Sequence, residues 1–334
     1  MVKELSEQVV VLVGASSGIG RETARQLGEK GATVVLAARN GDALREVADE
    51  VRELGGQAHV VVTDVAEWGQ VQNLASEAVE RFGRIDTWIN DAAIAVYATV
   101  EGTSVTEFDR VMDVNYMGQV HGIKAALPVM LAQGYGTIIN VGSVESYRAL
   151  PYHGAYTASK HAVKGLTDAL RLEMEHEKTG VEVVGIFPAS VNTPFFSHAR
   201  SRLGTKPAPP QPVYTPESVA AAIVSAAARP QRDVYVGGGS KLMRTLEFLS
   251  PRLTDRFMRT GGMMFRAQKS GRPDDGRDNF YEPMRDTAGV HGEYEAKSRP
   301  SVYTRVFEIT PRWARVAVPA LIAGAAGLMF LRRQ

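Results

Sequence analysis

The sequence has no cysteine among its 334 residues. Disulfide bonds, thiolate catalysis and cysteine-ligated zinc sites are therefore excluded. The seven histidines are scattered, with neither a His-x-x-x-His pair nor an HExxH motif, so we expect no metal site.

A strong net charge is also lacking. The 38 basic and 37 acidic residues give a formal net charge of +1, so we expect no nucleic-acid partner. The charge is unevenly placed, however. Residues 251–334 hold 15 basic and 9 acidic residues, whereas residues 1–250 hold 23 and 28. A mildly acidic body with a basic tail indicates a separate role for the tail.

Long apolar runs are almost absent. The N-terminal run Val9–Val13 is too short for a signal peptide and enters a glycine-rich turn, which predicts a cytoplasmic protein. Residues 316–331 carry no charge and have arginines on both sides, but they fall short of the roughly 20 residues that cross a bilayer. Three interpretations of 313–331 stay open: a membrane anchor, an interfacial helix, and a helix packed on the enzyme or on a partner subunit.

Short β-branched runs alternate with amphipathic helical patterns through most of the chain. The runs are buried on both faces and have helices between them, which predicts a parallel sheet in an α/β, Rossmann-like doubly wound fold. The expected strands lie at 9–13, 32–39, 58–65, 85–93, 136–143, 181–190 and 233–238.

A glycine-rich loop follows the first expected strand. Gly14, Gly18 and Gly20 stand between that strand and the next helix, the context in which such glycines let backbone N–H groups approach a pyrophosphate. We expect Ser16, Ser17 and Ile19 to complete this cofactor loop.

The end of the second expected strand points to the kind of dinucleotide. An acidic residue there favours NAD through the ribose 2′-hydroxyl, whereas arginine favours the 2′-phosphate of NADP. The acid is missing and Arg39 stands in its place. The sequence therefore predicts NADP (NADPH), with NAD the less favoured cofactor.

Several motifs occur together in a characteristic order. The glycine loop is followed by "NDAA" from Asn90, by Asn115 in "VMDVNYMG", by Ser143, and by Tyr156-x-x-x-Lys160. Over about residues 5–245 the chain resembles the short-chain dehydrogenase/reductase family. It departs from the usual pattern at Asp91, Ala93 and Ala189.

The resemblance implies roles for particular residues. Asn115, Ser143, Tyr156 and Lys160 would form the catalytic tetrad. The remaining cofactor contacts would come from Asp64 and Val65 at the adenine, and from Asn90, Pro188, Val191 and Thr193 towards the nicotinamide, with Tyr156 and Lys160 also touching the cofactor.

The spacing of Tyr156 and Lys160 has a chemical meaning of its own. Tyrosine has an ordinary pKa near 10, which suits acid–base work at neutral pH poorly. A lysine four residues on shares the same helix face, and its charge could lower the pKa of the phenol by roughly 1–3. Tyr156 is thus the expected acid and base.

These observations predict an NADP(H)-dependent oxidoreductase that interconverts a secondary alcohol and a carbonyl compound. A catalytically weak NADP-binding scaffold or redox-sensing protein is one alternative, and an epimerase or dehydratase on the same fold is another. Pro-rich residues 195–216 predict a mobile lid over an apolar pocket, which favours a lipophilic substrate. We also expect a homo-oligomer.

The chain divides into three expected parts. Residues 1–250 would form the NADP-binding Rossmann catalytic domain. Residues 251–311 are polar and poor in periodicity, so a largely flexible linker is expected there. Residues 312–334 would form the apolar C-terminal helix.

Overall fold

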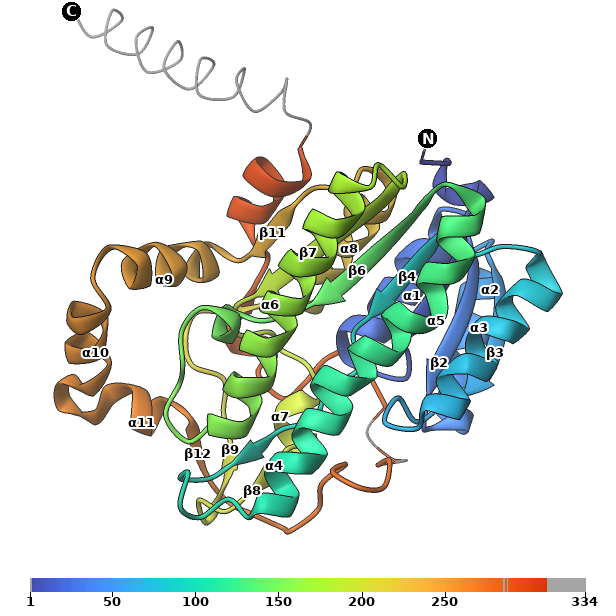
Figure 1. Cartoon of the computed structure of the whole chain (residues 1–334). Helices are drawn as coiled ribbons and strands as arrows, with labels where there is room; N and C mark the ends of the chain where they lie inside the picture. The colour runs from blue at the N-terminus through green and yellow to red at the C-terminus, as the bar shows by residue number, and fades with distance from the viewer. Residues whose placement is uncertain (1, 285, 287, 311–334) are drawn as a thin grey trace, which may run out of the picture.

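The computed structural model describes residues 2–284, 286 and 288–310. Its centre is a parallel sheet of seven strands in the order β11-β7-β6-β4-β1-β2-β3 (Figure 1). The strand bounds are Val9–Val13 (β1), Thr33–Ala38 (β2), Gln57–Val62 (β3), Thr87–Asn90 (β4), Gly136–Val141 (β6), Val181–Pro188 (β7) and Asp233–Val236 (β11). The order reverses beside β1, which is the switch point where doubly wound sheets bind ligands. The predicted Rossmann-like fold is confirmed.

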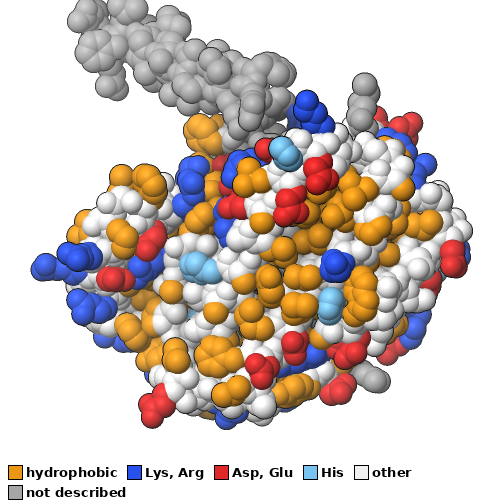
Figure 2. Space-filling view, in the orientation of Figure 1, with side chains coloured by type: hydrophobic (Ala, Val, Ile, Leu, Met, Phe, Trp, Pro, Cys, Tyr) orange, Lys and Arg blue, Asp and Glu red, His pale blue; other side chains and the backbone are white. Residues whose placement is uncertain are grey.

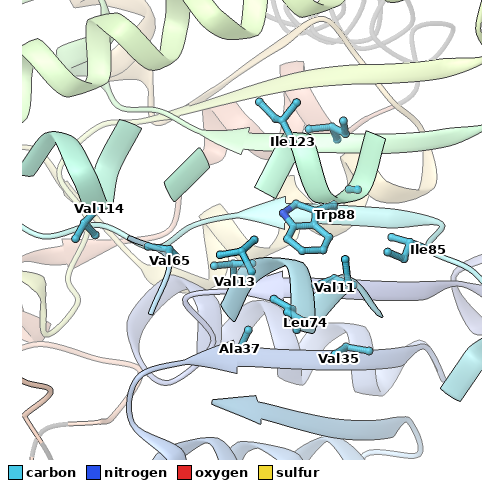
Figure 3. Close-up of a cluster of buried hydrophobic side chains, with 14 of the residues drawn as sticks. Val11, Val13, Val35, Ala37, Val65, Leu74, Ile85, Trp88, Val114 and Ile123 are labelled. Carbon is cyan, nitrogen blue, oxygen red and sulfur yellow. The ribbon is translucent and has the colours of Figure 1, made fainter. Parts of the chain in front are cut away.

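Helices cover both faces of this sheet. One face carries α1 (Gly18–Glu29), α2 (Gly41–Glu53) and α8 (Pro216–Ala228), and the other carries α3 (Trp68–Phe82), α5 (Gly118–Gln133) and α6 (Gly154–His176). Figure 3 shows the core on the second face, where Trp88 of β4 packs between strand valines and Ile123 of α5. Both faces of the central strands β1, β4 and β6 are buried, which explains their mostly apolar sequences, whereas the edge strand β3 is partly exposed.

Helix α4 (Val105–Met112) begins at a capping box in which Ser104 and Glu107 bond each other's backbone N–H groups. It runs through a π-helical turn, Asp113–Met117, directly into α5. Such turns are frequent at functional sites, and this one carries Asn115.

Three short strand pairs lie outside the main sheet, and the sequence did not predict them. They join β5 (Val96–Tyr97) to β8 (Arg200–Ser201), β9 (Thr205–Pro207) to β12 (Lys269–Pro273), and β10 (Val213–Tyr214) to β13 (Ser298–Arg299). Strands of two to five residues show too little alternation to be recognised.

The region after β11 contains regular secondary structure, part of which lies in residues 251–311, where a largely flexible linker was expected. Helices α9 (Gly238–Leu249), α10 (Pro251–Arg259) and α11 (Met263–Ala267) form an arm beside the sheet, and β12 returns the chain to the body (Figure 1). Lys and Arg side chains gather on this arm (Figure 2). The arm also leaves apolar side chains such as Phe248 and Leu253 exposed, so only weak core patterning marks it in the sequence.

We call residues 277–294, apart from 285 and 287, the strap. The strap lies against the body, and its Phe280 is fully buried in the same core as Trp88. Asp278 forms a salt bridge to Arg200 with an Nε–Oδ2 distance of 2.9 Å. An aromatic anchor and an ion pair are thus among the contacts that hold this polar, glycine-containing segment in place.

The apolar segment predicted at 313–331 lies outside the described residues. Among the residues that are described, no helix is long and apolar enough to cross a membrane. The boundaries at residues 250 and 311 likewise stay predictions.

Phe280 provides a test of how the strap is held. Phe280→Ala should lower the free energy of unfolding by about 3–5 kcal/mol, because it removes a fully buried aromatic side chain. Tyr281→Ala is the matched control, since that side chain is about half exposed. Urea denaturation of both variants measures the difference. Equal small losses would show that Phe280 does not anchor the strap.

Candidate active site

One cavity runs along the carboxyl edge of the sheet. The ends of β1, β2, β4, β6 and β7, the start of α6 and the strap all contribute to its lining. The topology therefore brings together residues that are far apart in the sequence, as expected at a switch point.

The glycine loop has the shape that a pyrophosphate needs. Gly14 and Gly18 have φ angles of +95° and +55°, which side chains other than glycine rarely adopt. A Cβ added to Gly20 would lie 2.1 Å from the carbonyl oxygen of Gly14. The glycines thus leave no side chains in the way of a close backbone approach at the N-terminus of α1, and these residues fit a dinucleotide.

Most of the predicted cofactor residues line this cavity. They are Gly14, Ser16, Ser17, Gly18, Ile19, Arg39, Asp64, Val65, Pro188, Val191 and Thr193, together with Tyr156 and Lys160. Gly20 and Asn90 are not in the lining. Gly20 packs beneath the loop, against Gly14.

Asn90 and Asn115 are both held by the protein interior. Asn90 accepts a hydrogen bond from Trp88 Nε1 (2.8 Å) and donates one to Asn140 Oδ1 (2.9 Å), so it joins β4 to β6. The amide of Asn115 bonds both backbone groups of Ile94 at 2.8 and 3.0 Å and also the hydroxyl of Ser159 at 3.1 Å. Its side chain is therefore occupied, and the role of Asn115 in the catalytic tetrad stays a prediction.

Ser143, Tyr156 and Lys160 meet at the end of β6. Lys160 is buried and donates from Nζ to the carbonyl oxygen of Val141 at 2.8 Å. The same Nζ lies 5.5 Å from the centre of the Tyr156 ring. Ser143 caps the turn Val144–Ser146, accepts from the backbone N–H of Glu145 at 3.1 Å, and lies against the phenol.

The acidity of Tyr156 differs from the expectation that Lys160 would lower its pKa. Burial, and then the charge of Glu145, raise the pKa of the Tyr156 phenol well above 10, although the hydrogen bond with Ser143 opposes this. Burial also lowers the pKa of Lys160 to about 8, against the charges of Asp91 and Glu145. The four-residue spacing predicted that Tyr156 and Lys160 lie close together. It did not predict how burial shifts the pKa of each group.

Asp91 is one of the departures from the family pattern, and it lies in the cavity. Burial raises the pKa of its carboxyl to about 7, while the charge of Lys160 and the backbone N–H of Gly20 act in the opposite direction. The carboxyl therefore lies near both the glycine loop and Lys160.

The far end of the cavity holds Arg39. Its guanidinium donates to the carbonyl oxygens of Asn279 and Tyr281 in the strap, both at 2.6 Å. Burial lowers the pKa of Arg39, and the charge of Asp64 opposes that shift. Asp64 itself forms a salt bridge to Arg110 at 3.0 Å.

The strap also bonds the cofactor loop. The N–H of Gly18 donates to the carbonyl oxygen of Gly289 at 3.0 Å, and Arg21 donates to that of Ala288 at 2.9 Å. At its other end the backbone N–H of Tyr294 donates to Asn192 Oδ1 at 2.9 Å. The strap thus roofs the part of the cleft between Arg39 and the glycine loop.

Sequence reasoning missed several residues of the cavity. The strap residues Asn279, Pro283, Met284 and Ala288 carry no motif, and their position depends on distant anchors. Glu145 stands only two residues after Ser143. That proximity was an available signal for Glu145, whereas His153 was expected from the sequence to line the substrate pocket or to pack beside it, and it does line the cavity.

The predicted lid is tied down in this structure. The N–H groups of Arg200 and Arg202 donate to the carbonyl oxygens of Ala95 and Tyr97 at 3.1 and 2.9 Å. Both guanidiniums contact the buried carboxylate of Glu107, which also caps α4. Glu107 thus links α4 to the lid, and Arg200 links the lid to the strap.

Comparisons with known proteins agree with this geometry. Residues 8–204 match the family model described as short chain dehydrogenase. The uncharacterized oxidoreductase YxnA of Bacillus subtilis strain 168 is 41% identical over 332 residues, covering 97% of this chain and 92% of the relative. A short-chain dehydrogenase/reductase from Burkholderia phymatum in complex with NAD has a TM-score of 0.68 at 28% identity, covering 75% of this chain and 96% of that one. An alcohol dehydrogenase from the archaeon Thermococcus sibiricus complexed with 5-hydroxy-NADP has a TM-score of 0.60 at 27% identity, covering 68% and 95%.

A Rossmann-like sheet with a glycine loop and a Ser-Tyr-Lys group at its carboxyl edge defines an oxidoreductase that uses a nicotinamide cofactor. The chain belongs to the short-chain dehydrogenase/reductase family, whose members act on CH–OH groups with NAD or NADP. The resemblance expected from the sequence is confirmed.

Glu107 gives a pH test of the link between α4 and the lid. Burial acts to raise its pKa, but hydrogen bonds from Arg202 and Ser104 outweigh burial and hold the pKa at about 2. Because this value lies below the usual 4.5, the carboxylate contributes stability above pH 4.5 that is lost as the pH falls towards 2. Glu107→Gln should therefore cost about 1–3 kcal/mol at pH 7 and almost nothing near pH 2.

The exposed Glu101 supplies the matched control, Glu101→Gln. Denaturant unfolding of wild type and both variants across pH 2–8 measures the effect. A Glu107→Gln cost that does not change with pH would contradict the assigned ion pairs.

Proposed function

We propose that the chain is an NADP(H)-dependent oxidoreductase that interconverts a secondary alcohol and a carbonyl compound, with Tyr156 as the acid and base. The observation that carries this proposal is the meeting of Ser143, Tyr156 and Lys160 in one cavity with the glycine loop. A carbonyl group can reach a proton donor and a dinucleotide at once only at such a place.

Ser143, Tyr156 and Lys160 each have a different role in the proposed carbonyl reduction. A bound nicotinamide cofactor would supply the hydride. The hydroxyl of Ser143 donates a hydrogen bond to the substrate oxygen and stabilises the alkoxide as it forms. The phenol of Tyr156, which is protonated at neutral pH, donates its proton to the same oxygen. The ammonium of Lys160 then stabilises the phenolate that is left.

Arg39 supports a preference for NADP. No acid stands at the end of β2, and the guanidinium lies in the cavity with two donors on neutral carbonyl oxygens. A phosphate dianion is a stronger partner than two carbonyls for a planar guanidinium. Binding of the 2′-phosphate would exchange these bonds and shift the strap locally.

We further propose a lipophilic substrate, a homo-oligomer and a cytoplasmic location. The aromatic lining from Tyr97, Phe195 and Phe196 supports a lipophilic carbonyl substrate. Exposed apolar side chains on α5 and α6, such as Leu131 and Leu172, support a homo-oligomer. The cytoplasmic location and the membrane contact through 313–331 are not tested by the described residues.

Tyr156→Phe tests the acid–base assignment. Because the variant keeps the ring and loses only the transferable proton, turnover of a carbonyl substrate should fall roughly 10²–10⁴-fold. NADPH binding, measured by fluorescence titration, should change little. Tyr147→Phe is the control, since that hydroxyl bonds Tyr235 and does not line the cavity. Full activity of the Tyr156→Phe variant would contradict the proposed role of Tyr156.

Arg39→Asp tests the cofactor preference. The change removes the partner of the 2′-phosphate and adds a repulsive carboxylate, so the NADP/NAD ratio of kcat/KM should fall about 10–100-fold. Arg45→Asp alters charge similarly on the exposed face of α2, where Arg45 pairs with Asp42, and serves as the control. An unchanged ratio in Arg39→Asp would refute the assignment.

A further inference from the structure

A buried acid–base pair lies beside the catalytic tyrosine. Glu145 Oε1 accepts a hydrogen bond from His153 Nδ1 at 2.8 Å, and Glu145 Oε2 accepts one from the hydroxyl of Thr157 at 2.6 Å. The exposed fractions of Glu145 and His153 are 5% and 2%. Both oxygens of this carboxylate are thus satisfied, as a buried charge requires.

These bonds determine what the other nitrogen of His153 can do. Since a carboxylate can only accept, Nδ1 carries a proton. Nε2 is therefore an acceptor in the neutral ring and a donor in the imidazolium, and its position is set by Glu145.

The imidazole ring is held between two tyrosines. Its centre lies 4.1 Å from that of Tyr97 at an interplanar angle of 27°, and 4.4 Å from that of Tyr156 at 15°. Phe195 packs edge-on against the imidazole, with 6.4 Å between the two ring centres. Tyr152, the residue before His153, has a φ of +63°. This value is strained for a bulky side chain at the start of α6. The backbone thus holds His153 stacked on the phenol.

One polar atom of this arrangement has no partner. His153 Nε2 is buried and forms no hydrogen bond to any of the described residues. Buried side-chain nitrogens are nearly always bonded, so an orphan in a ligand cavity indicates that the ligand supplies the partner. His153 lines the same cavity as Ser143 and Tyr156.

We infer that His153, positioned by Glu145, is a substrate-binding residue whose Nε2 bonds a second oxygen of the substrate, a few bonds from the carbonyl that is reduced. This inference rests on the proposed function, because the reacting oxygen is placed at Ser143 and Tyr156. The stacked ring then faces the substituents next to that carbonyl. The substrate class is a hydroxyketone, with an aromatic or aliphatic body against Tyr97, Phe195 and Leu150.

Matched pairs of ketones test this inference. The probes are butan-2-one with 3-hydroxybutan-2-one, cyclohexanone with 2-hydroxycyclohexanone, and 1-phenylpropan-1-one with 2-hydroxy-1-phenylpropan-1-one, each with NADPH. In at least one pair the wild type should prefer the hydroxyketone about tenfold or more in kcat/KM, since a site built to bond an oxygen rejects the analogue without it.

His153→Phe keeps the stacking and removes Nε2, so it should bring that preference close to one. Glu145→Gln keeps the shape of the carboxylate but weakens its hold on His153, and should reduce the preference part of the way. A purely structural role would lower kcat/KM for both members of a pair equally and leave the preference unchanged. His161→Gln, which lies on the same helix outside the cavity, is the control.

The outcomes separate the two proposals. If no carbonyl compound is reduced, the proposed function fails and takes this inference with it. Reduction of ketones without a preference for the hydroxyketones, or with a preference that survives His153→Phe, overturns the role of His153 alone. If His153→Phe does not fold, Glu145→Gln decides by the same ratio.

Discussion

The hydrogen bond from Lys160 to the carbonyl oxygen of Val141 holds the candidate site together. It joins the first turns of α6 to the end of β6, and thereby brings Tyr156 against Ser143. Lys160 has 1% of its surface exposed, and a buried ammonium group is costly. Here the ammonium gains a carbonyl partner and the nearby carboxyls of Asp91 and Glu145. The position of Tyr156, the stacking of His153 and the shape of the cavity all depend on how α6 packs against β6.

Burial also acts on the tyrosine. It raises the pKa of the Tyr156 phenol, so in the proposed reaction the phenol enters protonated. Burying the neighbouring polar groups costs free energy unless each of them has a hydrogen-bond partner. Glu145 has Thr157 and His153, and His153 in turn leaves one nitrogen for the substrate. Acid–base chemistry and substrate recognition therefore share one hydrogen-bond network.

Much of this could be predicted from the sequence, for physical reasons. The central strands are buried on both faces, so their β-branched runs stand out, and Val9–Val13 was located to the residue. The glycines of the loop and the Tyr156–Lys160 spacing are local motifs, so they can be recognised without knowledge of the fold. The strap could not be predicted, because Phe280 and Asp278 act through partners more than 70 residues away. The pKa of Tyr156 was missed because spacing describes neighbours, whereas burial depends on the whole fold.

The most direct test of the central claim follows the hydride. The wild-type chain would be incubated with NADPH carrying deuterium at the nicotinamide C4 position and with each ketone in turn, and the products analysed by mass spectrometry and NMR. The account predicts an alcohol with deuterium on the former carbonyl carbon and a hydroxyl proton drawn from solvent. NADPH that binds at the glycine loop while no ketone acquires deuterium would contradict it.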